Sequence, residues 1–147
     1  MELDAFLADA AETVHGKLYA LGIGWNTITV DTFPAILARV AIGMTLHVSY
    51  TETDEQHRLE LRLEDADGAR IALSGAQSMR SSETVMSIGA EFNVGRPEQL
   101  PAGDEQVICL AMTINSLLLE RAEMYNWVIE VNGIEIKRLP MRVQRTQ

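Results

Sequence analysis

The 147-residue sequence has a single cysteine, Cys109, and few basic residues. One cysteine excludes an intramolecular disulfide and any metal site built from several cysteines. The 12 lysines and arginines stand against 21 aspartates and glutamates, which leaves a net charge of -9. Nucleic acids and anionic membrane surfaces both require a basic patch, so we expect neither as a partner.

Long apolar runs are also missing. No stretch approaches the ~18 consecutive apolar residues that a membrane-spanning helix needs. Glu2 and Asp4 stand where a secretory signal peptide would begin with basic residues. These absences predict a cytoplasmic location by default, with export as part of a larger assembly as the open alternative. Because 47% of the residues are hydrophobic, we expect one domain, over residues 1–147, with a substantial core.

What the sequence does contain is alternation of apolar and polar residues, which indicates half-buried β-strands. The clearest case is at residues 125–131 and 134–137, on either side of Asn132-Gly133. An Asn-Gly pair between alternating runs predicts a β-hairpin, because both central residues of a type I′ turn have positive φ. Tyr125 and Trp127 share the apolar face of this hairpin and are predicted to pack in a core.

Other parts of the chain extend the same pattern. Residues 3–11 fit either a helix or a strand, residues 114–121 either a linker or a short helix, and the serine-rich residues 74–82 predict a mobile loop. About seven to nine short strands are typical of an all-β antiparallel sandwich, Ig-like or jelly-roll-like, with room for one short helix. The further predicted strands are 18–30 (interrupted by glycines), 36–50, 57–64, 69–73, 84–94 and 107–113.

Several motifs resemble those of a small uncharacterised bacterial family with domains of about 130–150 residues. They include L-E-L-R-L-x-D-A-D-G, F-x-V-G-R-P-x-x-L-P-x-G and a final Y-x-x-x-I-x-V-x-G-x-x-x-x-x-L-P-x-R-V. The resemblance covers nearly the whole chain and implies a compact β-rich domain, with no activity attached. The matching segments are residues 4–11, 16–25, 59–68, 92–103 and 125–143.

Asp65 and Asp67, which precede Gly68, are candidate calcium ligands at one end of the fold. Calcium takes six to eight oxygen ligands, so a single turn supplies too few. Asp54 and Glu55 could complete a site only if their loop lies at the same end. The alternative is a turn in which an aspartate side chain accepts hydrogen bonds from its own backbone.

No nucleophile, base or metal-binding histidine cluster has a recognisable spacing, so we predict no catalytic residue and no cofactor. His47 and His57 could meet across neighbouring strands, and we expect them to form a surface pair. Cys109 lies between apolar residues and is expected to pack on a strand face.

A second candidate site combines Arg96 and Asn93 with Trp25 in a recognition groove. Arg96 would anchor an anion or a carboxylate there. The alternative is that Arg96 pairs with an acidic side chain of its own chain.

Three functions therefore stay open. The first is a non-catalytic binding or assembly module that acts through its surface or a sheet edge, with a protein partner or a second copy. The second is a calcium-dependent or hydrolytic enzyme at the Asp65/Asp67 end. The third is a structural component of a phage-like or secretion particle.

Overall fold

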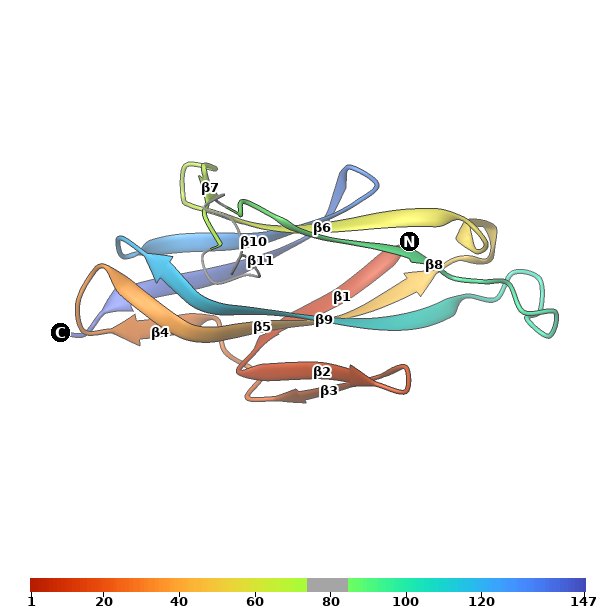
Figure 1. Ribbon diagram of the computed structural model, residues 1–147, viewed down its shortest axis with the longest axis horizontal. Coiled ribbons are helices and arrows are strands. Elements are labelled where there is room, and N and C mark those ends of the chain that lie inside the picture. Colours follow the sequence, from red (N-terminus) through yellow and green to blue (C-terminus); the bar gives the residue numbers. More distant parts are fainter. Residues whose placement is uncertain (74–84) are drawn as a thin grey trace.

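The computed structural model describes residues 1–73 and 85–147, so the loop expected at residues 74–82 lies outside the described residues. Within the described part, the regular structure is β-strand apart from one 3-10 turn, η1 (Tyr50–Glu52), and no helix has the length and apolarity needed to cross a bilayer. The all-β prediction is confirmed. The strands are β1 (Glu2–Ala8), β2 (Ala10–Val14), β3 (Lys17–Leu21), β4 (Thr27–Val30), β5 (Ala35–Val48), β6 (Gln56–Glu64), β7 (Arg70–Ile71), β8 (Ile88–Asn93), β9 (Gln106–Leu119), β10 (Glu123–Val131) and β11 (Ile134–Arg145) (Figure 1).

Three sheets organise these strands. The first has the order β1-β5-β9, the second has the order β4-β11-β10-β6 with β7 and β8 both paired to β6, and the third is the hairpin β2-β3. Pairing is antiparallel except between β4 and β11, which run parallel. A purely antiparallel fold was therefore the wrong expectation, because β4 and β11 are far apart in the sequence and no hairpin fixes their relative direction. Neither an Ig-like nor a jelly-roll-like arrangement is confirmed.

The core lies between the first and second sheets, which form the two main layers in Figure 1. Leu59, Leu61 and Leu63 of β6 are fully buried in it, as the alternation of this strand predicts. From the opposite layer, Ile42 and Met44 of β5 are also fully buried. One continuous apolar cluster therefore joins the two layers.

The predicted Asn-Gly hairpin is β10-β11. Asn132 and Gly133 have φ of 53° and 81°, the positive values that a type I′ turn requires. Trp127 is fully buried, and its indole N–H donates a hydrogen bond to Met141 Sδ at 3.4 Å. Tyr125 is buried too, and its hydroxyl donates to a backbone carbonyl. The aromatic face is core, as expected.

The N-terminal segment, which was expected to be either a helix or a strand, forms strands β1 and β2. The chain breaks at Asp9, whose amide bonds to the carbonyls of Leu21 and Gly22, and then forms the hairpin β2-β3. The turn of this hairpin is at His15-Gly16, with positive φ at both residues. These breaks raise the number of strands above the predicted range, to eleven in the described residues.

Strand β9 runs to Leu119 and is twice as long as the predicted strand at residues 107–113. The linker or short helix expected at residues 114–121 was wrong. Ile114, Leu117 and Leu119 are buried in the core because they pair with β5. Cross-strand packing outweighs local helix propensity in this segment. The outward face of β9 is open to solvent at Val107, which is 52% exposed.

Candidate functional site

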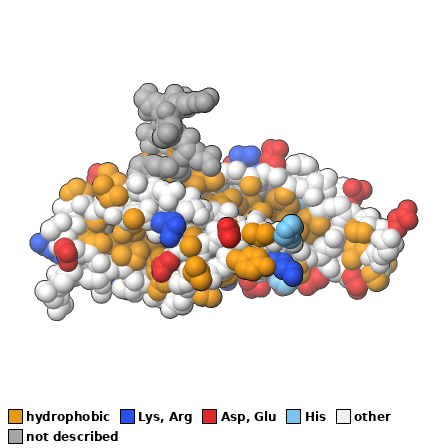
Figure 2. All heavy atoms as spheres, turned by 60° about the horizontal axis from the view of Figure 1, so that its bottom comes forward, with side chains coloured by type: hydrophobic (Ala, Val, Ile, Leu, Met, Phe, Trp, Pro, Cys, Tyr) orange, Lys and Arg blue, Asp and Glu red, His pale blue; other side chains and the backbone are white. Residues whose placement is uncertain are grey.

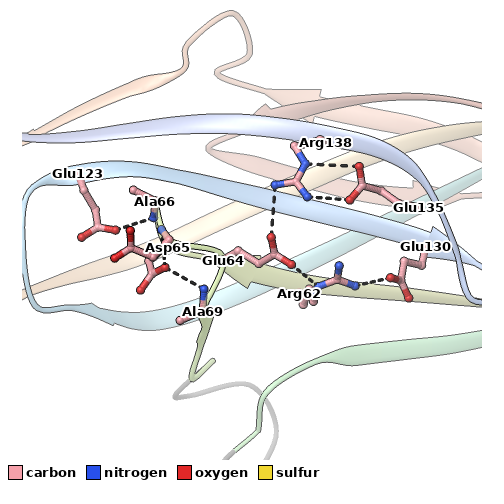
Figure 3. Close-up of polar contacts among 10 residues, drawn as sticks. Arg62, Glu64, Asp65, Ala66, Ala69, Glu123, Glu130, Glu135 and Arg138 are labelled. Carbon is pink, nitrogen blue, oxygen red and sulfur yellow. Dashed lines mark hydrogen bonds and ion pairs between the residues drawn. The ribbon is translucent and has the colours of Figure 1, made fainter.

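The Asp65–Gly68 turn follows the last residue of β6. Asp65 is buried, and its Oδ1 accepts hydrogen bonds from the amides of Asp67 and Ala69, both at 2.9 Å. Figure 3 shows this carboxylate turned into its own turn. Asp65 therefore accepts hydrogen bonds from the backbone of its own turn, which is the alternative to calcium binding that the sequence offered.

One further carboxylate reaches this turn, since Glu123 Oε1 accepts a hydrogen bond from the Ala66 amide at 2.7 Å. Asp54 and Glu55 precede β6 whereas Asp65 follows it, and a nine-residue strand separates the two loops by about 30 Å. Within residues 1–73 and 85–147, no group of three or more histidine, cysteine, aspartate or glutamate side chains is placed to hold a metal ion. The Asp65 and Glu123 carboxylates at this turn are both used by backbone amides, so the geometry does not assemble the predicted calcium site.

A chain of alternating charges crosses the outer face of the second sheet (Figure 3). Arg62 donates to Glu64 at 2.7 Å and to Glu130 at 2.6 Å, while Arg138 donates to Glu64 at 3.3 Å and to Glu135 at 2.7 Å. Burial lowers the pKa of Arg62, but its hydrogen bonds to both glutamates raise it by more. The hydrogen bond from Arg138 lowers the pKa of Glu135. All five side chains are paired with an opposite charge, so the network stabilises this face.

Sequence reasoning placed charged side chains on this face but missed how deeply two of them lie. The side chains of Arg62 and Glu64 are only 13% and 10% exposed. Val128, which shares this face, is fully buried. The signal was one apolar residue on an otherwise polar strand face, because long arginine stems cover such a residue while their charged ends remain in water.

Arg96 is held by the β5–β6 connection. Its Nε donates to Thr53 Oγ1 at 2.7 Å, one Nη donates to the Tyr50 carbonyl at 2.9 Å, and its guanidinium lies 4.4 Å from the centre of the Tyr50 ring. Within the described residues, the hydrogen bonds of Arg96 go to one hydroxyl and two backbone carbonyls and not to a carboxylate. It therefore neither pairs with an acid nor projects freely as an anion anchor, but ties two loops together.

Trp25 lies elsewhere. Its indole N–H donates to the Gly22 carbonyl at 2.7 Å, and its ring lines a cavity with Phe6 and Leu139, on the side where β1 lies beside β11. Asn93 is exposed at the end of β8, on the other side of the second sheet. The structure therefore does not bring Trp25 together with Arg96 and Asn93.

The two histidines also lie apart, so the expected surface pair was wrong. On β5, His47 Nδ1 is 2.9 Å from Glu105 Oε1 and its Nε2 is 3.3 Å from Asp4 Oδ2. The hydrogen bond to Glu105 raises the pKa of His47 above its ordinary value. His57, on β6, is buried between a backbone carbonyl of η1 and the Asn132 side chain. The side chains of His47 and His57 each join separate segments of the fold.

The outer face of the first sheet is covered in part by the β2-β3 hairpin. A groove of about 450 Å³ lies beside the hairpin, lined by Tyr19, Leu21, Arg39 and Thr113 together with small residues. Hydrophobic side chains gather on this side of the molecule among scattered charges (Figure 2). The strongly exposed ones on the hairpin and the following turn are Val14, Tyr19, Leu21 and Ile23.

The most distinctive feature is an open side of the core. Strand β1 lies beside β11 and closes one side of the two layers. On the other side the first sheet ends at β9 and the second at β8, and in the described residues β9 pairs only with β5 and β8 only with β6. We call this side the β8/β9 seam. Each of the two sheets thus ends in an unpaired edge along the seam.

Apolar side chains of the core are half-exposed along the seam. Their neighbours one strand further in are fully buried, as Leu46 and Met44 of β5 show. The residues of the seam are thus core residues that lack a covering layer on one side. They are Ile88, Phe92, Ile108, Leu110 and Met112.

A cavity of about 260 Å³ lies at the far end of the same side, between β7 and the end of β9. Ile71, Leu118, Leu119 and Tyr125 contribute its apolar wall, and Arg70 lies at its polar rim. The open side of the core therefore runs along much of β9.

In the described residues, these features define a class of protein: an all-β fold in which two strands that each pair on one side only, β8 and β9, border the same side of the core. The chain belongs to a family of unknown function, DUF6941, whose model matches residues 3–144. This agrees with the resemblance of its motifs to an uncharacterised β-rich family. No curated protein matches the chain.

Proposed function

We propose that this protein is a non-catalytic binding or assembly module that accepts an extended strand along β9. The β8/β9 seam is the observation that carries the proposal. An added strand would bond to the backbone of residues 106–114, which pairs only with β5 in the described part of the chain, and cover the partly exposed Ile108, Leu110 and Met112. In this proposal the two main layers form a sandwich that is open along one side.

Two kinds of interaction would contribute to such binding. Backbone hydrogen bonds along an edge supply affinity without regard to sequence, while the alternate side chains that enter the core supply selectivity. Strand β9 has the length for this role, with 14 residues. The composition of β9 favours it as well, because it lacks the charged residues and prolines that commonly protect edge strands from pairing.

The enzymatic alternative has weaker support. A calcium-dependent or hydrolytic site would need the Asp65 carboxylate, which is used by two backbone amides. The structural role in a larger particle is compatible with strand addition, because subunits of such a particle could associate through the same edge.

A synthetic peptide tests the proposal directly. The probe is residues 106–114 flanked by lysines for solubility, labelled with fluorescein and titrated with the full chain by fluorescence anisotropy. We expect saturable binding and slowed hydrogen exchange of the β9 amides. The same peptide with Leu110→Pro should not bind, since proline cannot complete the backbone ladder.

A matched pair of protein variants locates the binding. Leu110→Lys places an ammonium where the added strand would bury it, and should weaken binding by roughly tenfold or more. Ile134→Lys, at a 67% exposed position beside the Asn-Gly turn, should bind like the parent. Circular dichroism establishes that both variants are folded. Equal binding of the proline peptide, or protection of amides elsewhere than in β9, would overturn the proposal.

A further inference from the structure

Resting on the proposed function, we infer that the strand accepted along β9 is β9 of a second copy of this chain. The two strands pair antiparallel about a two-fold axis, in a register centred on Leu110. The result is one continuous six-stranded sheet, β1-β5-β9 followed by β9-β5-β1 of the second copy.

The charge distribution allows a second copy to pair along β9. The chain carries a net charge of -9, so two copies repel each other over most of their surfaces. The sequence of β9, QVICLAMTINSLLL, contains no aspartate, glutamate, lysine or arginine. Self-pairing of this strand therefore opposes no like charges, which would otherwise destabilise a cross-strand pair.

The register follows from the two faces of β9. Ile108, Leu110 and Met112 lie opposite the buried Leu46, Met44 and Ile42 of β5 and face the core. The intervening Val107, Cys109, Ala111 and Thr113 face outward. The alternation between core-facing and outward-facing residues holds through Ile114. It then changes phase, because the next buried residues are Leu117 and Leu119. Residues 106–114 are therefore the longest stretch of β9 with uniform alternation.

Opposite residues of an antiparallel pair lie on the same face of a sheet. A register centred on Leu110 uses all nine residues of this stretch. It places Ile108 opposite Met112 of the second copy, and Gln106 opposite Ile114 of the second copy. Every core-facing side chain then stays on the core side, where it covers the seam of the other copy. Glu105 falls opposite Asn115 of the second copy, so no two acidic residues meet.

The symmetry limits the assembly. A two-fold axis perpendicular to the sheet places the second sheets of both copies on the same side, so the two open seams meet. Such an isologous contact uses the β9 edge of both copies and closes at the dimer. An open filament would require a different edge.

Site-specific crosslinking tests both the dimer and its register. In a Cys109→Ala background, Leu110→Cys places two thiols directly opposite each other, with Cβ atoms about 5 Å apart. A short bis-maleimide should convert this variant to covalent dimer. Ile134→Cys in the same background, at an exposed position outside β9, should give little dimer. Sedimentation velocity over a concentration series should show that the parent protein forms dimers.

Leu110 lies partly in the core, so the Leu110→Cys substitution could disturb the fold. A second variant therefore tests the same register at exposed positions. Val107→Cys combined with Thr113→Cys, also in the Cys109→Ala background, uses two exposed positions that this register places opposite each other. The two positions are about 20 Å apart within one chain, so a short crosslinker can join them only between copies.

The outcomes separate this inference from the proposed function. A parent protein that stays monomeric at every concentration overturns the dimer, and binding of the β9 peptide would then leave strand addition intact. A dimer in which neither β9 variant crosslinks overturns the assigned interface. Failure of the peptide to bind together with a strictly monomeric protein refutes both.

Discussion

Replacement of Trp127 by alanine probes the packing on which both main layers depend. Trp127 is fully buried and lies between Leu63 of β6 and Leu139 of β11 in the strand register. A tryptophan buries about 200 Å² of surface, which at ~25 cal/mol per Å² corresponds to ~5 kcal/mol. Alanine retains part of this contact and the cavity relaxes in part. We therefore expect Trp127→Ala to lower the free energy of unfolding by about 3–5 kcal/mol.

The assay is thermal and urea denaturation followed by circular dichroism. For a chain of this size each kcal/mol corresponds to roughly 3–4 °C, so the melting temperature should fall by about 10–20 °C. The matched control is Ile134→Ala, because Ile134 is 67% exposed. Its free energy of unfolding should stay within about 0.5 kcal/mol of the parent value.

One result would refute the packing of the hairpin. If Trp127→Ala melts like the parent while its spectrum shows a folded protein, the aromatic face is not core. Tyr125 and Trp127 would then be available to a partner, and the binding surface would move from β9 to β10. If Ile134→Ala were as destabilised as Trp127→Ala, the tip of the hairpin would be packed as closely as its centre, contrary to the 67% exposure of Ile134.

Three further outcomes are expected. Gly43→Ala should destabilise the fold by about 1–3 kcal/mol in urea denaturation, because its Cβ would lie 2.5 Å from the Phe6 ring. Asp65→Ala should lower the free energy of unfolding by about 1–3 kcal/mol, because two backbone amides lose their acceptor. Addition of calcium should leave the melting temperature of the parent protein unchanged. A calcium-dependent rise in melting temperature that Asp65→Ala abolishes would instead support the metal site. The pKa of His47 is raised in the folded state by its hydrogen bond to Glu105, so its contribution to stability is present below about pH 6.5 and disappears as the pH rises through the raised value. Melting of His47→Gln should accordingly differ from the parent at low pH and converge with it above that value, whereas a pH-independent difference would contradict this.

Local pattern was sufficient for several elements of this fold. The alternation at residues 57–64 predicts β6 and its buried leucines, because side chains on successive residues of a strand point to opposite faces. The Asn132-Gly133 pair predicts the β10-β11 turn for a conformational reason, since both residues tolerate positive φ. The Asp65 turn follows from the ability of a short carboxylate to bond to nearby amides.

By contrast, the sequence pattern did not indicate which strands pair with each other. The second half of β9 is a strand because it lies against β5, and its own residues fit a linker or a helix equally well. The parallel contact between β4 and β11 joins residues more than a hundred positions apart. His57 is buried because η1 and Asn132 surround its ring, and no spacing within its own strand indicates this.

The same division holds for the candidate site. The sequence by itself determined strands with clear alternation such as β6 and β10, the Asn132-Gly133 turn and the absence of charge in β9, since each depends on neighbouring residues. Only the tertiary structure decided that β9 is an edge and that Ile108, Leu110 and Met112 are core residues without a full cover. Whether an apolar strand is central or at an edge depends on which distant segments lie beside it, and a local sequence pattern does not specify that.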